Sequence, residues 1–133
     1  MAVKLVKPIN HKKVVKITNQ DFEAKMRELR VNSDIAVAVS GGPDSLALMH
    51  LSNRYALNNN INLTVLSIDH GIRAESSKEI VWLKKVAKKN KINFYSTKLK
   101  KKINSSNTLS KARTLRYEAL SKYCIKKKIK FLL

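Results

Sequence analysis

Six residues, Ser40-Gly41-Gly42-Pro43-Asp44-Ser45, constrain the fold of this chain more than any other segment. They follow an unbroken apolar run at 35–39 and precede a helical pattern of apolar residues at 46–51. A short β-branched and small apolar run that ends in glycines is typical of a buried strand in a parallel sheet. Two glycines permit a sharp turn and the close approach of a ligand, because neither has a Cβ atom. The segment predicts a strand, a tight loop and a helix in direct succession.

The start of that helix is also a candidate anion site. Pro43 suits the first helical turn, where its missing N–H would have had no partner. The free N–H groups of the turn and the positive end of the helix dipole favour an anion. The loop lacks the lysine of a GxxxxGK phosphate loop and the spacing of a GxGxxG dinucleotide loop. A simpler interpretation is an ordinary turn, in which Asp44 complements the dipole and Ser45 is only polar.

Strands and helices alternate along the rest of the chain. Strands are expected at 35–39, 63–68, 92–99 and 130–133. A first helix is expected to begin at a capping box of Thr18 and Asp21. Further helices are expected from the glycine loop, residues 40–45, to about residue 57, and at 75–89 and 108–127. This alternation predicts an α/β fold, with a parallel Rossmann-like sheet and helices on both faces. Residues 1–17 have no clear period and are expected to form a basic arm before one domain at 18–133.

A second polar loop is expected at the same edge of the sheet as the glycine loop. With right-handed crossovers, every strand-to-helix loop lies at the carboxyl edge, where ligands bind in such folds. Asp69-His70-Gly71-Ile72-Arg73 follows the second strand. Asp69 and His70 are candidates to face reacting groups, and Arg73 supplies a cation. The alternative is a loop that caps the next helix, with His70 exposed.

The last expected helix carries two arginines where apolar residues would be expected. Its apolar arc consists of Leu109, Ala112, Leu115, Ala119, Leu120 and Tyr123. Arg116 falls inside this arc and Arg113 lies at its border. A guanidinium on a buried face is costly unless it is paired or reaches a charged ligand. Both arginines are therefore candidates to hold phosphates or a nucleotide; the alternative is an arginine that lies along the core and extends to its rim.

Composition limits the cellular setting. The formal charge is +19, from 28 basic and 9 acidic residues, which suits a polyanionic partner, nucleic acid first. Part of the lysine excess is attributed to A/T-rich codon usage, so clusters at 98–102 and 126–130 are also compatible with solvated faces.

No apolar run approaches the roughly 20 residues that span a bilayer. The lone Cys124 excludes an internal disulfide and CxxC pairs, and His11 and His50 have no second ligand at metal spacing. A cytoplasmic protein is expected.

Three segments, in order, resemble one enzyme family. VAVSGGPDSLALMHL, LSIDHGIRAESSKE and LSKARTLRYEAL are similar to the N-terminal part of tRNA(Ile)-lysidine synthetase, an SGGxDS-loop ATP pyrophosphatase with an adenine nucleotide alpha hydrolase-like fold. The resemblance covers about residues 35–133. It implies that ATP adenylates the C2 oxygen of the wobble cytidine in a tRNA(Ile) with a CAU anticodon. The amine of free lysine then displaces AMP to give lysidine.

The resemblance also implies roles for individual residues. The loop Ser40, Gly41, Gly42, Pro43, Asp44 and Ser45 would bind the ATP phosphates, and Asp44 would orient Mg2+ or the reacting phosphate. Asp69, His70 and Arg73 would border the nucleotide and substrate. Arg113 and Arg116 would meet ATP or the tRNA cytidine.

The chain departs from the family pattern at its end. It stops at Leu133, before the expected HHxDDQ-type segment, so the domain is expected to be incomplete at the C-terminus and inactive alone. A second polypeptide is a candidate to supply the missing part. Two other functions stay open. A tRNA 2-thiolation enzyme shares the loop but uses cysteines, which the lone Cys124 argues against. A non-catalytic nucleotide- or RNA-binding remnant is the other.

Overall fold

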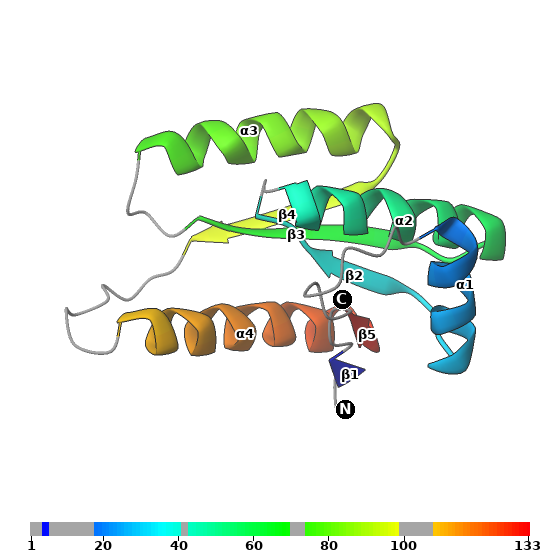
Figure 1. Cartoon of the computed structure of the whole chain (residues 1–133). Coiled ribbons are helices and arrows are strands. Elements are labelled where there is room, and N and C mark those ends of the chain that lie inside the picture. Colours follow the sequence, from blue (N-terminus) through cyan, green and yellow to red (C-terminus); the bar gives the residue numbers. More distant parts are fainter. Residues whose placement is uncertain (1–3, 6–17, 41–42, 70–73, 99–107) are drawn as a thin grey trace.

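The computed structural model describes residues 4–5, 18–40, 43–69, 74–98 and 108–133. One sheet contains five parallel strands in the order β1-β5-β2-β3-β4 (Figure 1). The strands are β1 (Lys4–Leu5), β2 (Ile35–Ala38), β3 (Leu63–Asp69), β4 (Asn93–Lys98) and β5 (Phe131–Leu132). The helices are α1 (Asn19–Glu28), α2 (Pro43–Asn59), α3 (Ala74–Lys89) and α4 (Thr108–Lys126). The predicted parallel α/β architecture is confirmed.

Helices cover both faces of the sheet, as expected. Figure 1 shows α2 and α3 on one face and α4 on the other. Alternate residues of β2 divide between these layers, because successive side chains of a strand point to opposite faces. Ile35 and Val37 pack into the larger core with α1, α2 and α3. Ala36 instead joins a smaller core of Leu66, Leu120, Tyr123, Cys124, Ile129 and Leu132, which places α4 against the sheet.

The capping box at the start of α1 is present as predicted. The Asp21 N–H donates to Thr18 Oγ1, and the Thr18 N–H donates to the Asp21 carboxylate, both at 3.1 Å. Hydrogen bonding of the Asp21 carboxylate, with the side chain and then with the backbone N–H of Thr18, lowers the pKa of Asp21. Phe22 is buried and meets the ring of Tyr55 on α2 edge to face, with 6.4 Å between the ring centroids. The first helix is thereby fixed against α2.

Two elements differ from the expectation. α2 continues to Asn59, whose side-chain amide donates to the Tyr55 carbonyl at 2.8 Å, and the helix ends where Asn60 takes a positive φ of 54°. A strand at Lys4–Leu5 also lies inside the segment expected to be an arm. Two residues without a hydrophobic period carry no strand signal, so only their pairing with β5 reveals this strand.

The order of the strands creates a topological switch point between β2 and β5. From β2 the chain adds β3 and then β4 on one side, and after α4 it returns to the other side of β2 as β5. In open α/β sheets, ligands bind outside the carboxyl ends of the strands at such a point. None of the helices described is long and apolar enough to cross a membrane.

Candidate functional site

A pocket of about 310 Å³ opens beside the carboxyl ends of β2 and β3, under α4. It is lined by Ala38, Val39, Ser40, Leu66, Ile68, Arg113, Arg116, Tyr117, Leu120, Leu132 and Leu133. The small side chain of Ala38, on the face that α4 covers, leaves room between the sheet and the helix. The pocket therefore lies at the topological switch point, where a ligand site is expected in this class of fold.

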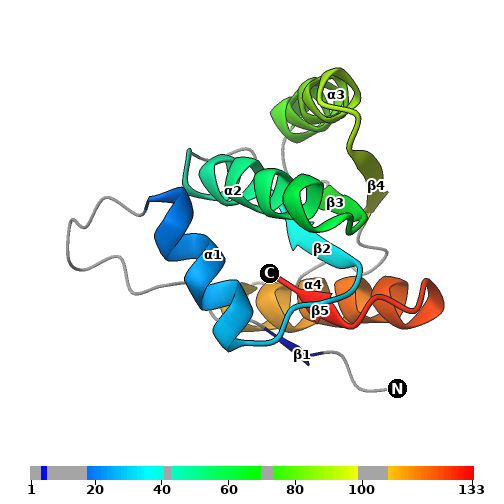
Figure 2. The same ribbon diagram turned by 90° about the vertical axis from the view of Figure 1, so that its right-hand side faces the viewer.

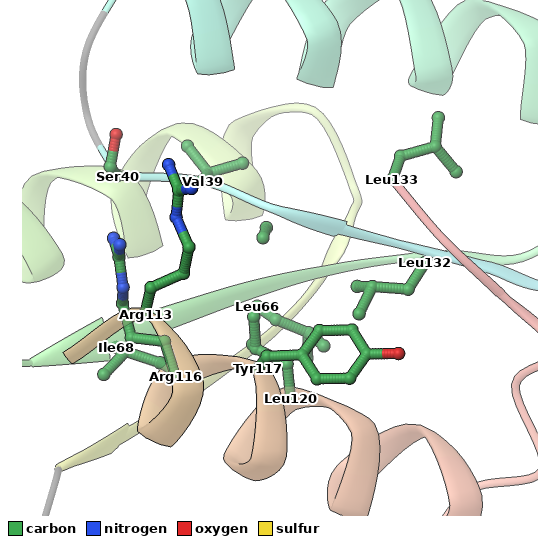
Figure 3. Close-up of a pocket in the computed structure, with 11 residues that line it drawn as sticks. Val39, Ser40, Leu66, Ile68, Arg113, Arg116, Tyr117, Leu120, Leu132 and Leu133 are labelled. Carbon is green, nitrogen blue, oxygen red and sulfur yellow. The ribbon is translucent and has the colours of Figure 1, made fainter. Parts of the chain in front are cut away.

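Both candidate arginines of α4 line this pocket. Figure 3 shows their side chains extending from the helix toward the end of β2, where Ser40 lies. Arg116 is half-buried and Arg113 is exposed. Within the described part of the chain, neither guanidinium forms a salt bridge with a carboxylate; the two salt bridges found there, Lys25–Glu28 and Arg27–Glu23, lie within α1. Two guanidinium groups facing one pocket suit an anionic ligand with several oxygens.

The glycine loop closes through its first and last residues. The Ser40 N–H donates to Ser45 Oγ at 3.2 Å, and the two hydroxyl oxygens are also 3.2 Å apart. Pro43 is the first residue of α2, as expected of a proline at a helix start. This closure holds the end of β2 next to the first turn of α2, at the positive end of the helix dipole. The geometry is that of an anion site at a helix N-terminus.

Asp44 is exposed in the first turn of α2. Its carboxylate is at the positive end of the helix dipole, which accounts for an acidic residue here without any ligand. Among the described residues, no group of three or more His, Cys, Asp or Glu side chains could hold a metal ion. A single carboxylate is nevertheless sufficient for Mg2+ when the phosphates of a bound nucleotide supply further oxygens.

Several predicted site residues cannot be placed. Asp69 is the last residue of β3, paired in register with Lys98, but its side chain is outside what the structure describes. Gly41, Gly42, His70 and Arg73 also lie outside the described residues. The structure thus brings Ser40, Arg113 and Arg116 together around one pocket and leaves the second loop unassigned.

Sequence reasoning missed the apolar part of the pocket. Tyr117, Leu132 and Leu133 line it together with residues of β2 and β3 (Figure 3). Tyr117 directly follows Arg116, so its position in the sequence could have indicated that it lies near the pocket. Leu132 of β5 and the adjoining Leu133 gave no such indication, because their place beside β2 depends on a long-range crossover. One side of the pocket is cationic and the other apolar, an arrangement that suits a ligand with both a charged and a hydrophobic part.

Cys124 lies in the smaller core, remote from solvent. Its side chain is 0% exposed, and burial raises the pKa of its thiol to about 11. A thiol that stays protonated and inaccessible at neutral pH is a poor nucleophile and a poor metal ligand. Cys124 therefore serves packing in this structure.

The fold and the loop define a class of nucleotide-binding domain. The family model of the PP-loop domain matches residues 10–133, and the chain belongs to this family. A PP-loop domain implies ATP binding. Known relatives are tRNA(Ile)-lysidine synthases, and the chain is homologous to about the N-terminal quarter of these enzymes.

Three of these relatives come from Rickettsia. The enzyme of Rickettsia bellii (strain OSU 85-389) is 44% identical over 101 residues, which cover 76% of this chain and 24% of that protein. The Rickettsia typhi enzyme is 37% identical over 109 residues, 80% of this chain and 25% of that protein. The Rickettsia felis enzyme is 37% identical over 117 residues, 86% of this chain and 27% of that protein. The chain therefore spans about a quarter of the length of these relatives.

A solved structure with the same fold is the U34-tRNA thiolase NcsA from Methanococcus maripaludis with its 4Fe-4S cluster. The TM-score is 0.71 over 85% of this chain and 43% of that chain, at 24% sequence identity. At this identity the likeness establishes the fold. It leaves the reaction to be argued from the site.

Proposed function

We propose that this chain is the ATP-binding part of a cytoplasmic lysidine-forming enzyme. The reaction ligates lysine to C2 of the wobble cytidine of a tRNA(Ile) with a CAU anticodon. The observation that carries the proposal is the pocket at the β2/β5 switch point, where Ser40, Arg113 and Arg116 meet. The identity to tRNA(Ile)-lysidine synthases supports this reaction over others of the PP-loop family.

In this proposal the glycine loop and the arginines hold the phosphates of ATP. The N–H groups at the start of α2, with Ser40 and Ser45, bind the phosphates that leave as pyrophosphate. Arg113 and Arg116 neutralise charge on the phosphates or on the adenylated cytidine. Mg2+, held by Asp44 and the phosphates, would screen the leaving pyrophosphate. Asp69, His70 and Arg73 border the reacting groups from the second loop.

The chemistry consists of two displacements on the same cytidine. The C2 oxygen attacks the α-phosphorus of ATP and pyrophosphate leaves, which converts a poor leaving oxygen into a good one. The free amine of lysine then attacks C2, the C–O bond breaks, AMP leaves, and the amine loses a proton. Cations at the first step favour the departing pyrophosphate, because they stabilise the negative charge that develops on it.

A polyanionic substrate agrees with the charge of the chain. The net charge is +19, and the lysines at 126–128 and Lys130 are exposed beside β5. Exposed lysines contact RNA mainly through its phosphates, which gives affinity that falls steeply with salt. We propose that part of this surface contacts the tRNA.

A thiolation reaction is less well supported. The structural neighbour is a thiolase with a 4Fe-4S cluster, whereas this sequence has one cysteine, Cys124, which is fully buried. A lone buried thiol can neither ligate a cluster by itself nor carry sulfur to a substrate. A nucleotide- or RNA-binding module without catalysis is the remaining alternative.

The test combines binding with catalysis. We expect the 133 residues to bind ATP, and to form no lysidine by themselves from tRNA(Ile), lysine and ATP, because they span only about a quarter of the relatives. Addition of the remaining part of a lysidine synthase should restore lysine incorporation, measured with radiolabelled lysine, and an Asp44→Ala chain should not support it. Salt-dependent tRNA binding that survives Asp44→Ala, without any ATP binding, would instead favour an RNA-binding module.

A further inference from the structure

β1 occupies the outer edge of the sheet. It lies beside β5 (Figure 2). The two strands run parallel, with Lys4 paired to Phe131 and Leu5 paired to Leu132. β5 pairs with β2 on the side away from β3 and β4, and β1 lies outside β5. β1 comes from the other end of the sequence.

The end of β5 and the residue that follows it form a wall of the pocket. Leu132 and Leu133 line the pocket, and Leu132 is 2% exposed. The Leu133 N–H donates to the Ala36 carbonyl at 2.8 Å, and the Ala38 N–H donates to the Leu133 carbonyl at 3.0 Å. β2 thus holds one edge of β5, and β1 holds the other.

We propose that β1 is an edge cap that orders β5 and, through it, the wall of the nucleotide pocket. A two-residue strand paired on one side only opens readily, because few hydrogen bonds oppose its fraying. Its free N–H and C=O groups would also be a template for pairing with another chain. Pairing with β1 removes both weaknesses at Phe131 and at Leu132, the residue of β5 that lines the pocket.

The docking of β1 on β5 and the binding of ligand in the pocket are coupled, and the coupling acts equally in both directions. If the docking of β1 favours the arrangement of Leu132 and Leu133 that binds ligand, the ligand must favour the docking of β1 by the same factor. This step relies on the proposed function for the nature of the ligand, ATP. The capping of β5 by β1 does not rely on the proposed function, because it concerns only the pairing of two strands.

The experiment replaces both residues of β1 by proline and compares the exchange of backbone amides. Lys4→Pro/Leu5→Pro removes both N–H groups, so that whichever of them pairs with β5 is lost. Lys4→Ala/Leu5→Ala is the matched control, because it shortens the same side chains and keeps both N–H groups. Hydrogen exchange at residues 131–133, read by mass spectrometry, reports the order of β5.

Expected results distinguish the cap from the ligand site. In the proline variant, exchange at residues 131–133 should be about tenfold faster than in the alanine variant, and the dissociation constant for ATP about three- to tenfold higher. Equal exchange in the two variants would overturn the edge cap. If the proline variant does not fold, hydrogen exchange in the unmodified chain tests the coupling between β1 and the pocket. ATP should slow amide exchange at residues 4–5. Slower exchange at the pocket residues without slower exchange at residues 4–5 would overturn the coupling. If ATP protects no residue at all, the proposed function fails, while exchange at residues 131–133 still decides the cap.

Discussion

Replacement of Arg116 by methionine separates a ligand-binding role of this residue from a packing role. Arg116 is half-buried on the face of α4 that meets the sheet, and within the described residues no carboxylate pairs with it. An unpaired cation in such a place lowers stability, because its desolvation is not compensated. Methionine has a similar length and a flexible apolar chain, so it can fill the same space beside Ile68 and Leu120.

Arg116→Met should therefore weaken ATP binding without a loss of stability. A hydrogen bond to a charged group contributes about 1.5 to 3 kcal/mol, which corresponds to a dissociation constant for ATP about 10 to 150 times higher. The free energy of unfolding should stay within about 0.5 kcal/mol of the original value or rise. Arg116→Lys keeps the charge but loses the planar fork, so its affinity for ATP should be intermediate.

Equilibrium dialysis with labelled ATP and urea unfolding measure the two quantities. Arg54→Met is the matched control, because Arg54 is exposed on α2 and does not line the pocket. This control should leave the affinity for ATP unchanged. A destabilised Arg116→Met chain that binds ATP as tightly as before would refute the reasoning and assign the arginine to packing along the sheet.

Three further predictions concern single side chains. Ser45→Ala should weaken ATP binding severalfold in the same dialysis, because it opens the closure of the glycine loop on Ser40. Tyr55→Phe should lower the free energy of unfolding in urea by about 1 to 2 kcal/mol, since the buried hydroxyl donates to the Val31 carbonyl at 2.6 Å; an unchanged midpoint would contradict this. Cys124 should react with a thiol reagent at pH 8 only after unfolding. Because burial raises its pKa from 9.0 to about 11, stability should fall as pH rises through this range, and a Cys124→Ala chain should lack this part of the fall.

Local patterns made most of the fold predictable. The apolar run at 35–39 gave β2, and Thr18 with Asp21 gave the start of α1, because both depend on neighbours in sequence. β1 was not predictable, since its two residues are a strand only through pairing with β5, more than a hundred residues away. The apolar arc predicted for α4 is incomplete. Leu120 and Tyr123 pack on the smaller core as expected, and Cys124, one turn after Leu120, packs there too although the predicted arc does not include it.

The candidate site could be predicted from the sequence where a charged residue stands at a position that the helical pattern assigns to the core. Arg116 stood out because a cation interrupts an apolar arc, and the structure places it in the pocket with Arg113 and Ser40. The apolar wall from β5 could not be read from the sequence, since any leucine pair at the end of a chain looks like ordinary core. It required the crossover that brings β5 beside β2.

The central claim is that the pocket at the β2/β5 switch point binds ATP through its phosphates. Equilibrium dialysis of the 133-residue chain against ATP, AMP and adenosine, with pyrophosphate as competitor, tests it most directly. Saturable binding is expected, with affinity falling in the order ATP, AMP, adenosine and with displacement of ATP by pyrophosphate. An Arg113→Met/Arg116→Met chain should lose this preference for ATP. Equal affinity for ATP and adenosine, or no saturable binding of ATP, would contradict it.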